Sequence, residues 1–186
     1  MRKSVAFFIY NIAICITVLL FSAVVSEAAT LQLKRSGMKD ISKGSTFSLP
    51  VTIDTKNESI TGADAIILYD PEMLTFVSAD DDKFFPFFTY KHESGSIRAS
   101  GVITDIKELK TGSGGMTTLK FKAIKSGQTK VQIFCDTSTN DTSKIILSDL
   151  DATNIINCKD IDDQTLHIVS EGFVATVTKF LFGWWK

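Results

Sequence analysis

Apolar and polar positions alternate along short stretches from about residue 30 to residue 170, and turn-forming residues separate these stretches. The clearest stretch places Phe47, Leu49, Val51 and Ile53 at every second position, which is the period of a strand with one buried face. No helical period interrupts this region. Short strands at regular spacing predict an all-β fold, a nine-stranded antiparallel sandwich with jelly-roll topology. Further strands are expected around Leu31, Ile97, Leu119, Val131, Ile145 and Leu166.

The stretch Gly62–Val77 predicts a strand, a sharp turn at Asp70-Pro71 and a second strand. In the first strand, the side chains of Asp64, Ile66 and Leu68 share one face, and those of Ala65, Ile67 and Tyr69 share the other. Both faces are largely apolar, although an outer strand of a sandwich should expose one polar face. Either a neighbouring loop covers Ile66 and Leu68, or this face binds a partner.

Four local features complete the domain. Residues 79–83 predict an exposed turn, and the phenylalanines of residues 84–88 are expected to plug one open end of the sandwich. Gly101 predicts a β-bulge. The glycine-rich residues 112–115 predict a flexible loop.

The N-terminal residues 1–28 have the composition of a targeting segment. Arg2-Lys3 precedes a mostly apolar run from Val5 to Val25, and the small residues Ser26 and Ala28 suit cleavage after Ala28. The run is also long enough to span a bilayer. Either a cleaved signal peptide or an uncleaved anchor places the domain of residues 30–170 outside the cytoplasm, secreted or membrane-anchored at the cell surface.

Two cysteines remain in the exported region, Cys135 and Cys158. An oxidising compartment favours one disulfide between them, and a free buried pair is the alternative. His92 and His167 are isolated and no CxxC spacing occurs, so the sequence predicts neither a metal site nor a cofactor.

The tail, residues 171–186, predicts a short amphipathic helix whose apolar stripe ends at two tryptophans. Such a stripe suits a helix at a membrane interface, and packing on the domain or on a partner is the alternative. The stripe comprises Phe173, Val177, Phe180, Leu181 and Trp184.

Charge and motifs exclude several function classes. The formal net charge is −1 and no basic cluster follows Arg2-Lys3, so nucleic acid is not an expected partner. No nucleophile elbow, metal motif or phosphate loop occurs, and the chain is predicted not to be an enzyme. The acidic runs at residues 80–82 and at Asp160, Asp162 and Asp163 are interpreted as solvated turns, with calcium binding as the alternative.

Four segments, in order, resemble the cohesin domain, a family within the carbohydrate-binding-domain-like superfamily. The resemblance covers about residues 30 to 170. It is carried by residues 44–51, by residues 62–77 with their Tyr69-Asp70-Pro71 signature, by residues 96–101, and by residues 114–122 closed by Gly127.

The resemblance implies a nine-stranded jelly roll that binds dockerin modules through one sheet face, with calcium held by the dockerin. It places Asp64 at the position of a recognition aspartate, so Asp64, Ile66 and Leu68 are the expected partner-binding residues. Gly62 stands where that branch of the family has an asparagine. The implied role is cell-surface assembly in a polysaccharide-related context, with membrane association.

Two other functions remain open from the sequence. One is a carbohydrate-binding surface module, although no tryptophan precedes Trp184 to supply an aromatic platform for sugar rings. The other is a structural cell-envelope domain whose apolar face holds neighbouring subunits.

Overall fold

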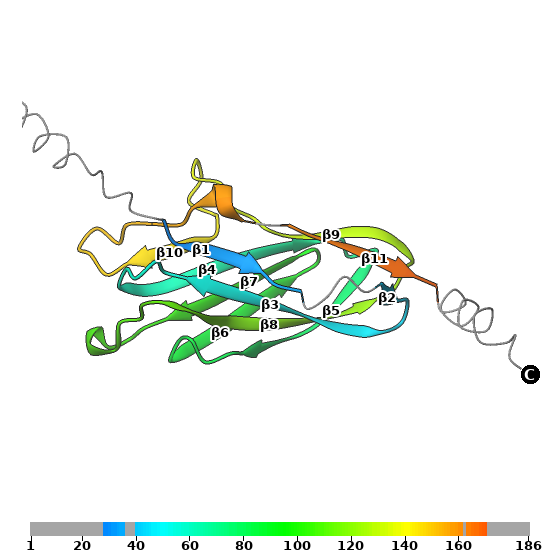
Figure 1. Ribbon diagram of the computed structural model, residues 1–186, viewed down its shortest axis with the longest axis horizontal. Coiled ribbons are helices and arrows are strands. Elements are labelled where there is room, and N and C mark those ends of the chain that lie inside the picture. The colour runs from blue at the N-terminus through cyan, green and yellow to red at the C-terminus, as the bar shows by residue number, and fades with distance from the viewer. Residues whose placement is uncertain (1–27, 36–39, 162, 171–186) are drawn as a thin grey trace, which may run out of the picture.

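The computed structural model describes residues 28–35, 40–161 and 163–170, which form two β-sheets packed face to face (Figure 1). The small sheet has the strand order β1 (Thr30–Leu33), β3 (Thr46–Asp54), β8 (Ser113–Ala123) and β5 (Leu74–Asp81). The large sheet has the order β2 (Ile41–Ser42), β11 (Gln164–Val169), β9 (Gly127–Ile133), β4 (Ile60–Tyr69), β7 (Ser96–Val102) and β6 (Phe87–Glu93). The short strand β10 (Lys144–Leu147) also pairs with β4, and two 3₁₀ turns, η1 (Ile106–Glu108) and η2 (Cys158–Asp160), lie in connections.

The all-β sandwich expected from the alternation is confirmed. The described residues contain eleven strands rather than nine, because the count includes very short strands such as β2 and β10. The pairings are antiparallel except that of β2 with β11, which is parallel.

The core fills the space between the sheets with the inward side chains of the alternating strands. In β3, Leu49, Val51 and Ile53 are at most 1% exposed, as their period predicts. In β4, the inward set is Ala63, Ala65, Ile67 and Tyr69. Phe121 of β8 packs at one end of the core, with the rings of Phe47, Tyr69 and Phe76 around it.

The other end of the core is closed by the loop between β5 and β6. Phe85 is 2% exposed and lies over Gly101, and Phe84 lies over Gly114. Phe87, in contrast, is 55% exposed and belongs to β6. Phe84 and Phe85 therefore form the expected plug, and Phe88 packs half-buried against the core from the edge strand β6, which the chain enters directly after Pro86.

The turn at Asp70-Pro71 separates β4 and β5 as predicted, and the Asp70 carbonyl accepts hydrogen bonds from the backbone N–H groups of Met73 and Leu74. The Asp70 side chain accepts a further bond from the N–H of Glu72 at 2.8 Å. The two strands joined by this turn belong to different sheets, so the turn carries the chain across the sandwich.

Three local predictions were wrong. The predicted turn at residues 79–83 is largely strand, because β5 continues to Asp81 along β8, where Lys120 forms an ion pair with Asp80. Gly114 and Gly115 lie inside β8, paired with β3. Gly101 keeps a regular register with β4 and β6, and no bulge forms there. Packing requires this glycine, since a Cβ at Gly101 would lie 2.0 Å from Cδ2 of Phe85.

The strand β4 changes its neighbour on one edge partway along its length. Residues 60–64 pair with β10, and residues 67–69 pair with β9. At the gap, the backbone N–H of Ile66 donates to Oγ of Ser143 at 2.9 Å, and its carbonyl accepts from the N–H of Phe134 at 2.7 Å. Ser143 is fully buried, so a serine side chain continues the hydrogen-bond ladder where no strand does.

Candidate functional site

Three neighbouring strands of the large sheet, β4, β7 and β6, present a continuous face away from the core. The register aligns their outward side chains in cross-strand rows. We call this surface the β4–β7–β6 face; its rows are Asp64, Ser100 and Thr89; Ile66, Arg98 and Lys91; and Leu68, Ser96 and Glu93.

A hollow of about 470 Å³ lies on this face. Its apolar part is formed by Ile66, Leu68 and Phe134, of which Ile66 is only 6% exposed and the other two are half-buried. Polar and charged side chains surround them, namely Lys91, Glu93, Ser96, Arg98 and Asp141. An apolar floor inside a charged rim is the usual anatomy of a protein-binding surface.

Arg98 stands in the middle row and links the charges of the face. Its guanidinium lies 3.6 Å from Oδ2 of Asp64 and also donates a hydrogen bond to the Asp141 carboxylate. Oδ1 of Asp64 accepts a hydrogen bond from the Ser100 hydroxyl at 2.6 Å. The Asp64 carboxylate is therefore held in a fixed orientation by two neighbours on β7.

The strand β6 carries a second ion pair, which joins the middle row to the last one. The Lys91 ammonium lies 2.7 Å from Oε1 of Glu93, and this hydrogen bond and charge lower the pKa of the Glu93 carboxyl. Both side chains are mainly exposed, so the pair orients charge at the rim but contributes little to stability.

One edge of the hollow comes from the connection between β9 and β10, which supplies Phe134 and Asp141. Cys135 forms a disulfide with Cys158, with their Cα atoms 5.4 Å apart, and fastens this connection to η2. The buried hydroxyl of Thr142 accepts a hydrogen bond from the N–H of Asp136 at 2.7 Å. These contacts hold Asp141 opposite Arg98.

At the other end, the face exposes apolar side chains. Phe87 pairs with Val102, and Val102 pairs with Gly62; the side chains of Phe87 and Val102 are 55% and 42% exposed. A Cβ at Gly62 would lie 2.9 Å from the carbonyl oxygen of Gly101, so the backbones are close at this point. The glycine that replaces the expected asparagine leaves this end without a polar side chain.

The structure places Asp64, Ile66 and Leu68 together on this face, as their strand period indicates. Ile66 is largely covered, because the β9–β10 connection lies against it. Arg98, Lys91, Glu93, Phe134 and Asp141 also line the hollow, and sequence analysis missed them. Alternation within β7 could have placed Arg98 outward, but its position beside Ile66 depends on strand order.

Acidic residues of both runs make contacts with other residues of the domain. Asp81 forms an ion pair with Lys83, Asp163 with Lys130, and Asp160 accepts a hydrogen bond from Asn157. Among the residues that the structure describes, no group of three or more His, Cys, Asp or Glu side chains could hold a metal ion.

Residues 1–27 of the N-terminal segment lie outside the described residues, as does Asp162. So does the tail stripe of Phe173, Val177, Phe180, Leu181 and Trp184. In the part of the chain that is described, no helix has the length and apolar character needed to cross a membrane.

The fold defines a class of protein, the antiparallel β-sandwich modules built from two packed sheets. The family model of the cohesin domain matches residues 31–159, which is more than half of the chain. The chain therefore belongs to the cohesin family.

Solved cohesin structures share this fold at low sequence identity. The cohesin module of a family 33 glycoside hydrolase from Clostridium perfringens has a TM-score of 0.61 at 12% identity, covering 77% of this chain and 98% of that one. A non-cellulosomal cohesin from Archaeoglobus fulgidus has a TM-score of 0.57 at 18% identity, covering 81% and 98%. The third cohesin ScaC of Acetivibrio cellulolyticus, solved in complex with the ScaB dockerin, has a TM-score of 0.59 at 15% identity, covering 76% and 99%. No curated protein matches the chain.

Proposed function

We propose that this chain is a non-catalytic binding module that docks a dockerin-type protein on the β4–β7–β6 face. The observation that carries the proposal is the hollow in which Ile66, Leu68 and Phe134 are surrounded by the charged pairs of Arg98 and Lys91. Membership of the cohesin family supports this choice of partner, since several similar cohesins were solved in complex with dockerins.

In this proposal the residues of the face have different roles. Leu68 is half-buried and offers apolar area to the partner, whereas Ile66 mainly supports the floor from below. Asp64 and Arg98 are already paired, so a docking protein meets an oriented charge pair rather than two mobile side chains. Preorganised charges favour specificity and correct register more than affinity.

We also propose an extracytoplasmic location, secreted or anchored at the cell surface, where the domain takes part in polysaccharide-related assembly. The charged and apolar order of residues 1–28 supports export. The disulfide between Cys135 and Cys158 supports an oxidising compartment. Membrane association through residues 1–28 or the tail is part of this proposal.

The experiment measures binding of the full chain to a panel of purified dockerin modules in millimolar Ca²⁺ by biolayer interferometry. The test variant is Asp64→Ala with Leu68→Asp. Leu68 is preferred to Ile66 because a carboxylate at the buried Ile66 would test folding rather than binding. We expect at least a 30-fold loss of affinity, equivalent to about 2 kcal/mol, which is typical of an interface hot spot.

The matched control is Val77→Asp, which adds a carboxylate to β5 of the other sheet at a side chain that is 53% exposed. This control should bind as the wild type does, and both variants should keep the wild-type melting temperature within a few degrees. Failure of the wild-type chain to bind any dockerin, or wild-type affinity of the folded test variant, would contradict the proposal.

A further inference from the structure

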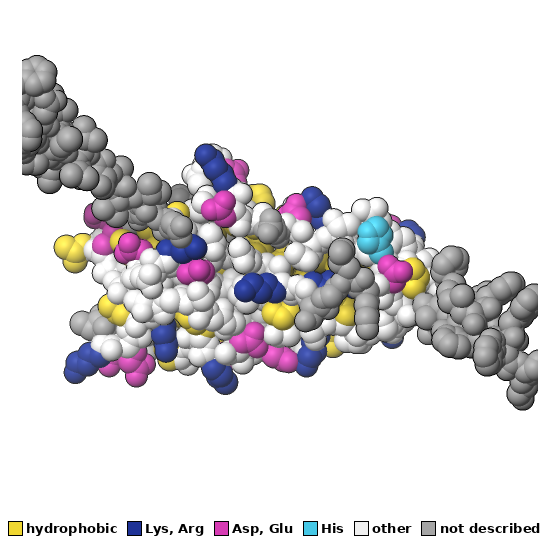
Figure 2. Space-filling model, viewed as in Figure 1, with side chains coloured by type: hydrophobic (Ala, Val, Ile, Leu, Met, Phe, Trp, Pro, Cys, Tyr) yellow, Lys and Arg dark blue, Asp and Glu magenta, His cyan; other side chains and the backbone are white. Residues whose placement is uncertain are grey.

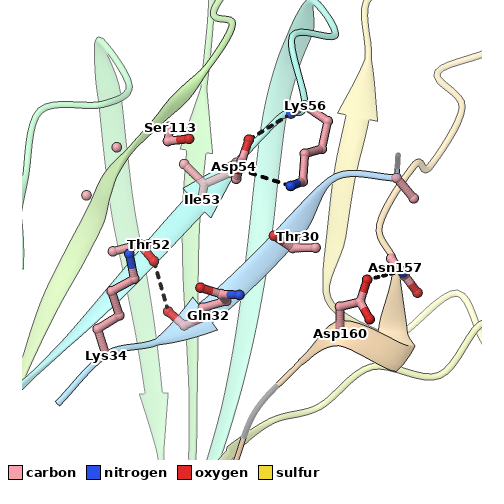
Figure 3. Close-up of a pocket in the computed structure, with 13 residues that line it drawn as sticks. Thr30, Gln32, Lys34, Thr52, Ile53, Asp54, Lys56, Ser113, Asn157 and Asp160 are labelled. Atoms are coloured by element: carbon pink, nitrogen blue, oxygen red, sulfur yellow. Dashed lines mark hydrogen bonds and ion pairs between the residues drawn. The ribbon is translucent and has the colours of Figure 1, made fainter. Parts of the chain in front are cut away.

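A groove of about 800 Å³ lies on the outer surface of the small sheet, on the opposite side of the sandwich from the β4–β7–β6 face. This volume is within the range of ligand sites in proteins. Figure 3 shows Gln32 and Thr30 on β1, Asp54 at the end of β3, and Asn157 with Asp160 at η2 on the other flank of β1. The groove has no role in the proposed docking, because its residues belong to the other sheet and to η2.

The floor of the groove is built by two cross-strand rows. Thr30 pairs with Asp54, which pairs with Ser113; in the next row Gln32 pairs with Thr52, which pairs with Gly115. Gly115 has no side chain, and the side chain of Asp82 lies over it on the β8 side, where a Cβ at Gly115 would be 3.0 Å from Oδ2 of Asp82. Both rows are polar across three strands, whereas the opposite faces of these strands are in the core.

The flank at η2 is held in place by covalent and backbone contacts. The N–H of Asn157 donates to the carbonyl of Ala29 at 2.8 Å, directly before β1. Cys158 is joined to Cys135 by the disulfide, and the side-chain amide of Asn157 donates to Asp160 at 2.5 Å. The carboxylate of Asp160 therefore has a defined position beside the floor.

The groups that line the groove are hydrogen-bonding groups of both kinds with balanced charge. Lys56 forms an ion pair with Asp54, and Lys34 and Asp160 also line the groove, so the lining has two cations and two anions. Within the described residues, the side-chain amide of Gln32 has no hydrogen-bond partner and can both donate and accept. Figure 2, which has β1 in front, likewise shows basic and acidic side chains interspersed on this side of the molecule.

This lining selects among ligand classes. A large apolar side chain of a peptide would have no apolar surface to pack on in this groove. The one large apolar residue of the lining, Ile53, is 1% exposed and belongs to the core. An anionic polymer would need an excess of cations, which the lining does not have. A neutral polyhydroxyl ligand suits the groove, since each hydroxyl both donates and accepts and carries no charge.

We propose that this groove binds a neutral oligosaccharide, held by hydrogen bonds to Gln32, Thr52 and Asp54 on the floor and to Asp160 on the flank. None of the described residues that line the groove is aromatic and could stack on a sugar, so hydrogen bonds exchanged with water supply the affinity. A single site is therefore expected to bind in the millimolar range, and useful binding to a polysaccharide requires several chains on one surface.

The test uses the full chain in mild detergent, biotinylated and tetramerised on streptavidin so that weak sites act together. This probe is applied to an array of immobilised oligosaccharides with neutral β-glucan, xylan, mannan and chitin fragments beside sulfated and uronic-acid ones. The test variant is Gln32→Ala with Asp160→Ala, which removes one floor group and one flank group. We expect a signal on at least one neutral class, reduced at least tenfold by the test variant.

The matched control is Gln128→Ala with Asp163→Ala, which removes the same two groups from exposed positions outside the groove. The control should keep the wild-type signal, and thermal melts should show that both variants are folded. Three outcomes overturn the proposal: no binding to any neutral oligosaccharide, binding confined to the anionic ones, or equal signals from the two variants. The docking variant Asp64→Ala with Leu68→Asp should retain the array signal, so the two proposals fail separately.

Discussion

At the residue scale, a glycine at a position where two segments pack closely can be as necessary to the fold as a large core side chain. Phe85 is almost fully buried against Gly101, where a Cβ would lie 2.0 Å from the ring. Because Gly101 of β7 has no side chain, the β5–β6 loop can place Phe85 over it and close this end of the sandwich.

We predict that Gly101→Ala destabilises the fold by about 2–3 kcal/mol, because the added methyl group forces Phe85 out of its position. Chemical denaturation measures the change. The matched background is Phe85→Ala, in which the new methyl group has room, so the same substitution should cost less than 1 kcal/mol there. Equal costs in the two backgrounds would show that the two residues do not compete for space.

Asp54 gives a prediction for acid stability. The pKa of its carboxyl is lowered, chiefly because it accepts a hydrogen bond from the N–H of Lys56 at 2.9 Å, with the Lys56 charge and Ser113 adding to the effect. A lowered folded-state pKa stabilises the protein above the unfolded pKa of about 3.9, and this contribution is lost as the pH falls through the folded pKa.

The melting temperature of Asp54→Asn should therefore lie below that of the wild type at pH 6. The difference should shrink as the pH falls below 4, and it should continue to shrink as the pH falls through the lowered pKa of the folded state and Asp54 becomes protonated. Thermal melts from pH 2 to pH 6 test this. A difference that is independent of pH would mean that the Asp54 charge has no part in stability.

At the element scale, the strand β4 organises the large sheet. It pairs with β7 along one edge. Along the other edge, its first half pairs with β10 and its end pairs with β9. Ser143 bridges the gap between the two partners, so one side chain completes the edge beside the hollow.

We predict that Ser143→Ala costs about 1–3 kcal/mol of stability, because the buried N–H of Ile66 loses its acceptor. The control is Ser148→Ala at an exposed position, which should be within about 0.5 kcal/mol of the wild type. Denaturation gives both values, and amide hydrogen exchange should show the largest loss of protection at Ile66. An unchanged exchange rate at that amide would contradict the role given to Ser143.

At the scale of the whole molecule, the disulfide links the two candidate surfaces. Cys135 lies in the connection that supplies Asp141 to the β4–β7–β6 face, and Cys158 begins the η2 turn that flanks the groove.

We predict that replacing both cysteines, Cys135→Ser with Cys158→Ser, lowers the free energy of unfolding by about 3 kcal/mol. The two positions are 23 residues apart, and without the bond the unfolded chain regains the conformational entropy of this loop. Reductant should lower the wild-type denaturation midpoint to that of the variant and leave the variant unchanged. Equal midpoints for wild type and variant without reductant would exclude a stabilising bond.

Much of the fold followed from local pattern. The alternation of Leu49, Val51 and Ile53 fixed the inward face of β3, and Asp70-Pro71 placed the turn after β4. The pattern failed at Asp80 and Asp81, which are polar as in a turn but belong to an edge strand. Charged side chains are tolerated there, and Asp80 pairs with Lys120. It failed at Gly101 because this glycine makes room for the ring of Phe85, which belongs to a different part of the chain, the β5–β6 loop.

For the candidate site, the sequence by itself determined which residues of β4 share a face, because the strand period depends only on the backbone. Asp64, Ile66 and Leu68 were identified together in this way. Only the tertiary structure decided which strands lie beside β4, and therefore that Arg98 and Asp141 meet at this face and that Gln32 and Asp160 meet across the groove. Strand order and loop closure join residues far apart in the chain, and no local pattern of apolar and polar positions contains that information.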